Sequence, residues 1–182
     1  MLQRLYSVVL TKKNILVTGQ PGIGKTTFIK KVAEALNILS PAGFYTAEIR
    51  EKSIRKGFEL ISLSGAKGLL SHIDIKSPHR VSKYGVDIGG FDIFLGSISF
   101  FDPATKIIII DEIGKMECFS EKFRTLMKRI LDSDKISIST VALKGCGLIA
   151  EVKKREDVNI FEISMTNRDY LLSEILKEIG FP

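Results

Sequence analysis

The sequence is poor in cysteine and has no long apolar run. Its two cysteines, Cys118 and Cys146, do not form a C-x-x-C pair, and two are too few for a disulfide framework, so a reduced, cytoplasmic setting is expected. The longest obvious apolar run, Ile107–Ile110, is far shorter than a membrane span. The stretch Leu5–Leu10 is too short for a signal peptide and lacks a small-residue cleavage site. These shortages argue against disulfide-rich secreted and membrane-spanning classes.

The bulk composition is that of an ordinary globular chain. A length of 182 residues, with 45% hydrophobic and 26% charged residues, predicts one domain over residues 1–182. The 27 basic and 21 acidic residues leave a formal charge of +6, which suits anionic ligands such as nucleotides. The basic residues form no long run and alternate with no aromatic stripe, so the balance allows nucleic-acid binding without supporting it.

The strongest local signal is the segment Gly19–Thr26, which matches the phosphate-loop pattern G-x-x-x-x-G-K-[ST]. The apolar residues before it predict a buried strand over 14–18, and the spacing after it predicts a helix over 25–36. Glycines let successive backbone N–H groups point at one anion, beside the positive end of the helix. Lys25 is then expected at the β- and γ-phosphates and Thr26 on Mg²⁺. The alternative is a glycine-rich turn that binds nothing, which would require strand, loop and helix to agree by accident.

A second signal follows the apolar strand at 107–110. Asp111 comes directly after that strand, as in a Walker B motif, and is expected to hold the water shell of the Mg²⁺ that Thr26 also contacts. Glu112 comes next and is a candidate for polarising the attacking water. This acidic pair favours hydrolysis over transfer to a small acceptor, because transfer calls for an acceptor pocket and an Arg-rich lid. The plainer interpretation of each acid is a solvated residue at a strand end.

The remaining pattern predicts alternating strands and helices. Residues 51–57 would join an antiparallel hairpin, 65–78 would be an exposed connection, and 81–88 fits no element clearly. Glycine at position 180 should end the last helix. Further strands are expected over 44–50, 58–64, 136–143 and 158–163. Further helices are expected over 2–10, 91–101 and 148–155. Two more helices should begin after a cap at Ser120 and after a capping box at 166–169. This order predicts an α/β fold with a doubly wound, mainly parallel sheet and an inserted hairpin.

Several stretches in order resemble one known family, the small nucleoside-triphosphatases of thermophilic bacteria and archaea, which have a human cancer-related relative. The resemblance covers nearly the whole chain after the first dozen residues, and its most distinctive stretch is Asp111–Glu117. The stretches that carry it are 19–27, Gly43-Phe44-Tyr45-Thr46 with Glu48 and Arg50, Arg55–Phe58, Lys83–Asp87, Asp111–Glu117 and Asn167–Asp169. The pair Gly89-Gly90 departs from the more acidic helix start expected there, and residues 1–13 form a longer leading segment than usual.

The resemblance implies slow, Mg²⁺-dependent hydrolysis of ATP, GTP, CTP and UTP with little base discrimination. It also implies a three-layer P-loop fold of the additional-strand type, in which the Walker A and Walker B strands are not sheet neighbours. Lys25 and Glu112 are the expected catalytic residues, and Thr26 and Asp111 the expected metal ligands. The expected nucleotide-binding residues are Gly19, Gln20, Pro21, Gly22, Ile23, Gly24, Lys25, Thr26, Thr27, Asp111 and Glu112.

Other residues are weaker candidates. Arg50 and Arg55 flank the predicted hairpin tip, and either is a candidate arginine finger or simply a solvated charge. Lys115 and Glu117 are candidate supporting residues beside the Walker B acids. Arg168 is a candidate for contacting the base or ribose, or for a structural role in the helix start. The two histidines, at positions 72 and 79, have no partner motif and are interpreted as surface residues, and no neighbour makes Cys118 a convincing nucleophile.

Two other functions stay open. A nucleotide or nucleoside kinase would consume ATP faster when an acceptor is added. A nucleotide switch associated with RNA or a protein would turn over incidentally and respond strongly to its partner. A regulatory GTPase fits less well, because the sequence contains no Asn-Lys-x-Asp motif for reading guanine.

Overall fold

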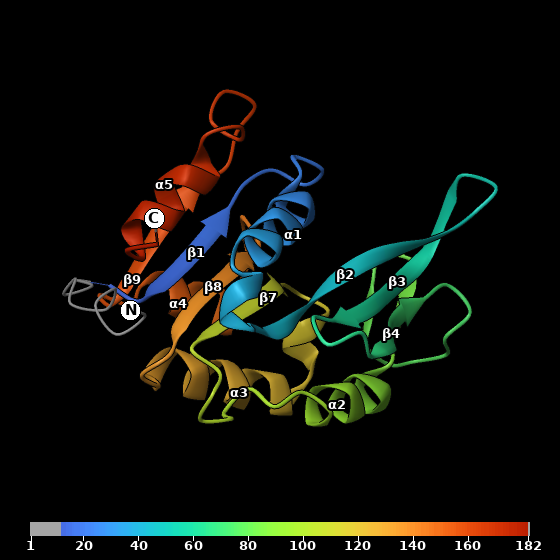
Figure 1. Ribbon diagram of the computed structural model, residues 1–182. Coiled ribbons are helices and arrows are strands. Elements are labelled where there is room, and N and C mark those ends of the chain that lie inside the picture. Colours follow the sequence, from blue (N-terminus) through green and yellow to red (C-terminus); the bar gives the residue numbers. More distant parts are fainter. Residues whose placement is uncertain (1–11, 182) are drawn as a thin grey trace.

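The computed structural model describes residues 12–181 (Figure 1). The helix predicted over 2–10 lies outside the described residues. None of the helices within 12–181 has the length and apolarity needed to cross a membrane.

One continuous nine-stranded sheet runs through the described residues, in the order β5-β6-β4-β3-β2-β7-β8-β1-β9. The strands are β1 (Asn14–Thr18), β2 (Ala42–Glu51), β3 (Ile54–Ser62), β4 (Lys67–His72), β5 (Arg80–Val81), β6 (Tyr84–Val86), β7 (Ile107–Ile113), β8 (Ile136–Val141) and β9 (Val158–Glu162). Strands β2, β7, β8, β1 and β9 pair in parallel. Because β8 lies between β1 and β7, the Walker A and Walker B strands are not neighbours, which confirms the additional-strand topology.

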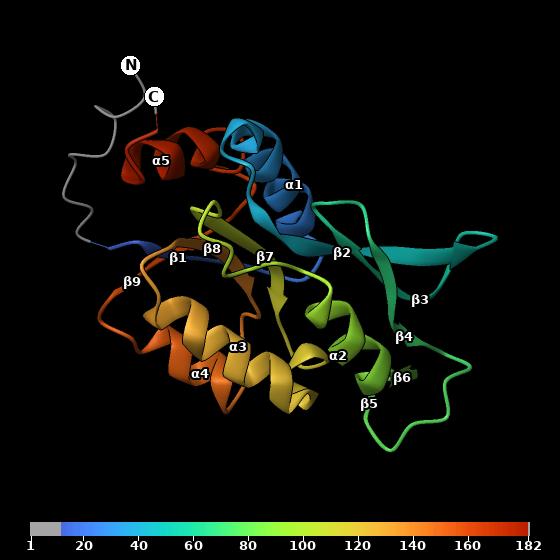
Figure 2. The same cartoon turned by 60° about the horizontal axis from the view of Figure 1, so that its bottom comes forward.

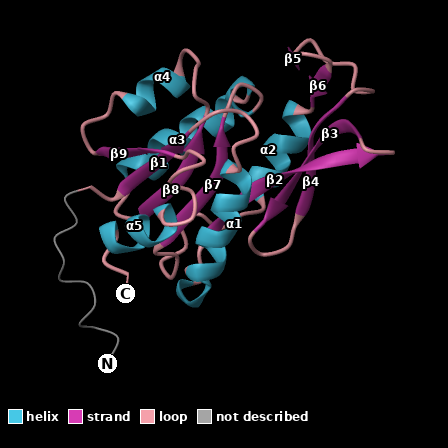
Figure 3. Ribbon diagram, turned by 90° about the horizontal axis from the view of Figure 1, so that it is seen from above, coloured by secondary structure: helices cyan, strands magenta, loops and turns pink. Residues whose placement is uncertain are grey.

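Helices cover both faces of this sheet, which gives three layers (Figure 2). The helices α1 and α5 lie on one face, and α2, α3 and α4 on the other. Seen from above, α1 lies over the middle of the sheet (Figure 3). The helices are α1 (Lys25–Ala35), α2 (Ile88–Gly96), α3 (Glu121–Asp132), α4 (Leu148–Lys153) and α5 (Leu171–Glu178), with short 3₁₀ turns at Asn37–Leu39 and Glu117–Phe119.

The layers bury a separate apolar core on each face of the parallel strands. Ile107 and Ile109 pack with Phe28 of α1, whereas Ile108 and Ile110 pack with Phe123 of α3. A strand covered on both sides must be apolar at every position, which explains the run of isoleucines. The strand continues past this run, so Asp111 and Glu112 lie within β7 rather than just after it.

The antiparallel part of the sheet is larger than the predicted hairpin. The β2–β3 hairpin is present, but its turn is short and β3 begins at Ile54, so the long connection predicted over 51–57 is wrong. The predicted exposed connection at 65–78 contains β4, which pairs with β3 and buries Leu70. Its Ser- and Gly-rich composition hid a strand that is specified by pairing. Strands β5 and β6 extend the sheet further.

Three helix boundaries also differ from the prediction. Helix α2 begins at Ile88 and ends at Gly96, well before the predicted stop at 102–103. The Asp87 carboxylate caps it by accepting a hydrogen bond from the Gly90 N–H, so the glycine pair lies inside the first turn rather than breaking it. Helix α5 begins at Leu171, and its N-cap residue makes no side-chain cap bond, so the predicted capping box is wrong. The cap at Ser120 is confirmed, because its hydroxyl accepts from the Phe123 N–H at 2.9 Å.

Candidate active site

The phosphate loop connects β1 to α1, as its sequence predicts. Gly22 and Gly24 have φ angles of 78° and 105°, in the left-handed region that glycine enters at little cost. Gly24 precedes the first helical residue, Lys25, whose Nζ donates to the Gly19 carbonyl at 3.2 Å. The Lys25 side chain thus folds back over the loop, whose backbone path depends on the left-handed conformations of Gly22 and Gly24. Ile23 packs against the core on the α1–α5 face, away from the cleft that the other loop residues line.

Asp111 on β7 is the point at which three strands of the sheet, β2, β7 and β8, meet the start of α1 after the phosphate loop. Its Oδ2 accepts a hydrogen bond from the Thr26 hydroxyl at 2.7 Å, and its Oδ1 accepts one from the Thr140 hydroxyl on β8 at 2.6 Å. The Thr46 hydroxyl on β2 is 3.3 Å from Oδ2. The carboxylate is only 1% exposed. Three hydroxyl donors compensate for burying this charge, so the acid is held in one orientation beside Thr26.

Glu112 faces the same site from the next position. Its Oε2 lies 3.5 Å from the Lys25 Nζ, and the side chain is 30% exposed. Burial raises the pKa of Glu112 above its usual value, while the Lys25 charge opposes that shift and the Asp111 charge adds to it. The peptide bond between Asp111 and Glu112 is cis. A carboxylate with a raised pKa next to the phosphate loop is a better proton acceptor than a solvated one.

A second buried carboxylate, Glu117, lies behind Glu112. A Cβ built on Gly114 would lie 2.7 Å from Glu117 Oε2 and 3.1 Å from Glu112 Oε1, so both acids flank that glycine. Burial is the main cause that raises the pKa of Glu117 to about 8, and the charges of Glu112 and Asp111 contribute to the same rise. The neighbouring Lys115 is exposed and lines the cleft. The sequence grouped these two as supporting residues, but only Glu117 is buried against the site.

Lys153 of α4 was not identified from the sequence. Its Nζ donates to the carbonyls of Ala142 and Leu143 at 2.7 and 3.0 Å, where the chain leaves β8 beside the cleft. Burial lowers the pKa of Lys153, and the nearby Glu112 charge opposes this shift. Because its partner groups are backbone carbonyls, no sequence motif marks this contact.

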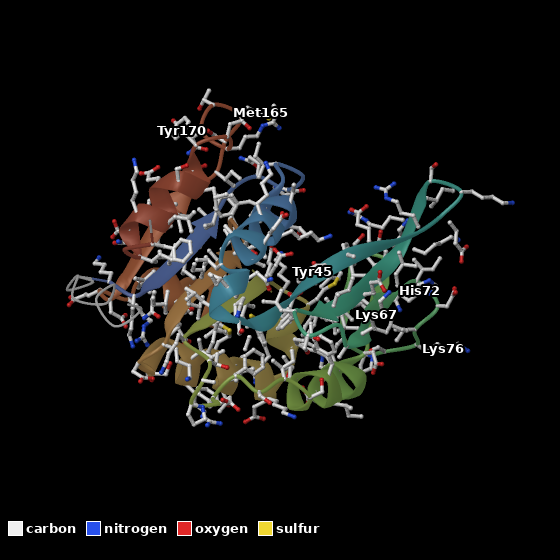
Figure 4. The ribbon with its side chains drawn as sticks, viewed as in Figure 1. Tyr45, Lys67, His72, Lys76, Met165 and Tyr170 are labelled. Carbon is white, nitrogen blue, oxygen red and sulfur yellow. The ribbon has the colours of Figure 1, made fainter. Side chains whose placement is uncertain are left out.

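The remaining weak candidates lie apart from the phosphate loop. Arg50 and Arg55 both pair with Glu48 on the β2–β3 hairpin, at 2.6 and 2.7 Å. Arg168 is exposed on the segment between β9 and α5, where Figure 4 labels the exposed side chains of Met165 and Tyr170. Arg168 does not line the cleft described below.

The sulfur and imidazole candidates also stay outside the chemistry. Burial raises the pKa of the Cys118 thiol to about 12, which leaves it protonated at neutral pH. His72 lies at the end of β4, far from the loop in Figure 4, and its Nδ1 is 3.3 Å from Asp74. It is half-buried rather than fully on the surface, whereas His79 is exposed.

A large cleft runs from the phosphate loop to the antiparallel strands. It has a volume of about 1340 Å³. One end is lined by the loop, Thr46 and Glu112, and the other by Glu48, Arg55 and Tyr84. It is larger than the 300–1,000 Å³ typical of a small-molecule site.

The oxygen atoms around Asp111 suit a magnesium ion. A hydroxyl and a carboxylate are hard ligands of the kind that Mg²⁺ prefers, and Mg²⁺ is usually held by one or two such groups together with substrate phosphates and water. Within residues 12–181 no cluster of three or more His, Cys, Asp or Glu side chains is placed to hold a metal. The pair Thr26 and Asp111 is therefore suited to an ion that the nucleotide helps to hold.

Comparison with known proteins gives consistent results. Residues 14–176 match the model of a family described as NTPase. The chain is 44% identical to "Nucleoside-triphosphatase THEP1" of Thermotoga maritima, over 92% of this chain and 95% of that protein. It is 34% identical to the human "Cancer-related nucleoside-triphosphatase", over 90% and 95% of the two chains. The crystal structure of THEP1 from Aquifex aeolicus superposes with a TM-score of 0.79 at 33% identity, over 91% of this chain and 98% of that one.

Proposed function

The chain belongs to the NTPase family, and from this premise we propose that it hydrolyses nucleoside triphosphates to diphosphate and phosphate with the help of Mg²⁺. The carrying observation is the 2.7 Å hydrogen bond between Thr26 and Asp111. It joins the end of the phosphate loop to the Walker B acid, and it is the contact at which a nucleotide-bound Mg²⁺ would be held. When bound, the ion would neutralise charge on the β- and γ-phosphates.

The residues of the loop bind and orient the triphosphate in this proposal. The backbone N–H groups from Gly19 to Thr27 surround the phosphates. Lys25 leaves the Gly19 carbonyl and the Glu112 carboxylate, 3.2 and 3.5 Å away, and turns to the phosphate oxygens. Glu112 then loses a cation partner just as the substrate arrives. Its raised pKa supports a role in accepting a proton from the attacking water.

The same proposal includes ATP, GTP, CTP and UTP as substrates and a slow turnover. Backbone amides and Lys25 contact phosphate oxygens, which are the same in every triphosphate. The chain carries no Asn-Lys-x-Asp motif, which is in keeping with weak base selectivity. We also propose that residues 1–182 act as one domain, since the described part forms a single continuous sheet. The low cysteine content supports a cytoplasmic setting for this domain.

The primary test is phosphate release from each of the four triphosphates, with and without Mg²⁺ and with and without a panel of nucleosides and monophosphates. Mg²⁺-dependent release from all four without an acceptor is the expected result. Consumption that requires an acceptor and yields a phosphorylated product would replace hydrolysis by kinase activity. Turnover that appears only with RNA or a protein partner would favour a nucleotide switch.

Two variants test the assigned roles. Glu112→Gln should keep triphosphate binding while turnover falls by about a hundredfold or more, because a positioned base contributes 10²–10⁴. In the wild type, turnover should fall as pH drops through the raised pKa of Glu112, because the carboxylate must be ionised to accept a proton. Lys25→Ala should weaken binding itself. Glu34→Gln, on the exposed side of α1, is the matched control. Unchanged turnover in Glu112→Gln would remove Glu112 from the role of base.

A further inference from the structure

The end of the cleft opposite the phosphate loop carries an excess of positive charge. Arg50, Arg55 and Lys83 line it, together with one carboxylate, Glu48. Glu48 lies between the two arginines, at 2.6 Å from Arg50 Nη2 and 2.7 Å from Arg55 Nη1. One carboxylate cannot neutralise three cations, so this wall of the cleft favours a further anion.

Arg55 is held in a fixed orientation by its other contacts. Its Nε donates to the Tyr84 hydroxyl at 3.0 Å, and its guanidinium carbon lies 5.1 Å from the centre of the Phe58 ring and 5.8 Å from that of Tyr84. Those two rings pack edge to face at 5.5 Å. A planar guanidinium that is stacked and hydrogen-bonded on one side loses little freedom when it binds an oxyanion on the other. In the structure the Glu48 carboxylate binds this other side of the guanidinium.

The strand order separates this cluster from the phosphate loop. Arg55 lies on β3, two strands from β7, and Tyr84 lies on β6, four strands from β7. At about 4.8 Å between strands, these offsets are roughly 10 and 19 Å. Along β2, Arg50 comes four residues after Thr46, which is about 13 Å in an extended strand. Arg55 is hydrogen-bonded to Tyr84, whose strand lies on the side of β3 opposite β7, so the anion that Arg55 favours is separate from the triphosphate on the loop.

We propose that Arg50, Arg55 and Lys83 form a second oxyanion subsite of the cleft, which takes a phosphate group that is separate from the triphosphate on the loop. A phosphate matches the fork of Arg55 and displaces the Glu48 carboxylate from it. The group has two sources: free phosphate, as released by hydrolysis, or the phosphate of a second small molecule. The inference goes beyond the proposed hydrolysis and does not need turnover.

Glu48 acts in this subsite as an internal competitor. The hydrogen bond from Arg55 lowers the pKa of Glu48 below its usual value, so the carboxylate stays ionised near neutral pH. Replacing it with glutamine should therefore tighten phosphate binding rather than weaken it. A cluster that only ties the hairpin together would show no such gain.

The test is a titration followed by the NMR signals of arginine side-chain N–H groups. The phosphate loop is first filled with Mg²⁺ and a non-hydrolysable triphosphate analogue, and inorganic phosphate or AMP is then added. We expect a saturable shift of the Arg55 and Arg50 Nε–H signals with at least one of the two probes, which identifies the source. In Arg55→Gln, binding is followed at the Arg50 Nε–H signal and should weaken about tenfold or more, as for a lost hydrogen bond to a charged group. Glu48→Gln should strengthen binding severalfold.

The controls separate this subsite from the phosphate loop and from surface charge. Arg129→Gln removes another stacked arginine, 4.5 Å over the ring of Phe101 and outside the cleft, and should change nothing. Arg50→Gln, an exposed side chain without a stacking partner, gives a second variant should Arg55→Gln not fold. Binding should persist in Lys25→Ala, whereas the proposed hydrolysis should not. Three results would overturn the subsite: loss of the shift in Lys25→Ala, undiminished binding at the Arg50 signal in Arg55→Gln, or a shift that saturates in neither wild type nor Glu48→Gln.

Discussion

The two halves of the sheet place polar side chains in opposite surroundings. In the parallel half, Asp111 is almost fully buried and accepts hydrogen bonds from Thr26 and Thr140 at 2.7 and 2.6 Å. In the antiparallel half, Glu48 lies between two arginines with its side chain 36% exposed. Helices cover both faces of the parallel strands, while the β2–β3 hairpin projects beyond them (Figure 1).

The contrast shows that polar contacts of similar length differ in how much they contribute to stability. Around Asp111 water is excluded, so each hydroxyl is needed to stabilise the charge, and its removal is costly. Around Glu48 water can replace either arginine, so the pairs contribute little to stability and can be exchanged for a ligand. The parallel half suits a preorganised reaction centre, and the antiparallel half suits an exchangeable anion. Four changes, in order of decreasing expected effect, test this division.

The largest effect is expected from Asp111→Asn. The amide cannot accept from both threonine hydroxyls as a charged carboxylate does, and it is a poorer ligand for Mg²⁺. We expect phosphate release to fall by about a thousandfold or more, equivalent to about 4 kcal/mol. Asp134→Asn, an exposed acid after α3, should leave the rate unchanged. Phosphate-release kinetics that stay within tenfold of wild type would contradict the role of Asp111.

Gly43→Ala should break the junction between the halves. Gly43 lies on β2 opposite Ile109 of β7, and a Cβ there would come within 1.8 Å of the Ile109 carbonyl oxygen. Its φ of 144° is also unfavourable for alanine. We expect a loss of about 3 kcal/mol or more in the free energy of unfolding, as for a forced backbone shift in a core. Urea unfolding measures it, and Gly65→Ala, at a turn with no atom within 4 Å of its added Cβ, is the comparison for positive φ alone. Equal losses in both variants would mean that the junction tolerates the side chain.

Glu117 should make stability depend on pH. Its folded pKa is raised by burial from an ordinary 4.5 to about 8, so the folded protein binds the proton more tightly. The contribution of Glu117 to stability is therefore largest below pH 4.5 and is lost as pH rises to about 8. Since one pKa unit corresponds to about 1.4 kcal/mol, the loss should be measurable by urea unfolding. Urea midpoints measured without Mg²⁺ should decline over this range in wild type and decline less in Glu117→Gln. Identical pH profiles would show that Glu117 is not a buried acid.

The smallest effect is expected from Arg50→Gln. Its pair with Glu48 is half-exposed, and such pairs contribute about 1 kcal/mol or less. The urea midpoint should change as little as in Lys128→Gln, which removes an exposed pair with Glu151 in the parallel half. A loss above about 2 kcal/mol would mean that Arg50 orders the hairpin and that the two halves differ less than we infer.

The sequence could predict the parallel half because its signals are local. The loop Gly19–Thr26 and the strand of isoleucines before Asp111 each carry a pattern that only a narrow set of structures satisfies. The antiparallel half gave weaker signals. The sequence predicts a connection where β4 lies, because a short strand with a Ser- and Gly-rich composition has no distinct periodicity. It predicts too late a start for α2, because the cap at Asp87 outweighs the low helix propensity of Gly89 and Gly90.

The site shows the same division between local and long-range information. The sequence motifs alone identify four candidate site residues, Lys25, Thr26, Asp111 and Glu112. The order of motifs and elements also indicates the fold class and the family. Only the tertiary structure brings Thr46 and Thr140 to Asp111, moves Arg55 to Tyr84, and buries Glu117 behind Glu112. A motif encodes chemistry that neighbouring residues perform together, whereas these contacts join strands through sheet order and register. Sheet order and register depend on the packing of the whole chain, because burial and strand pairing are determined by tertiary contacts and not within any short segment.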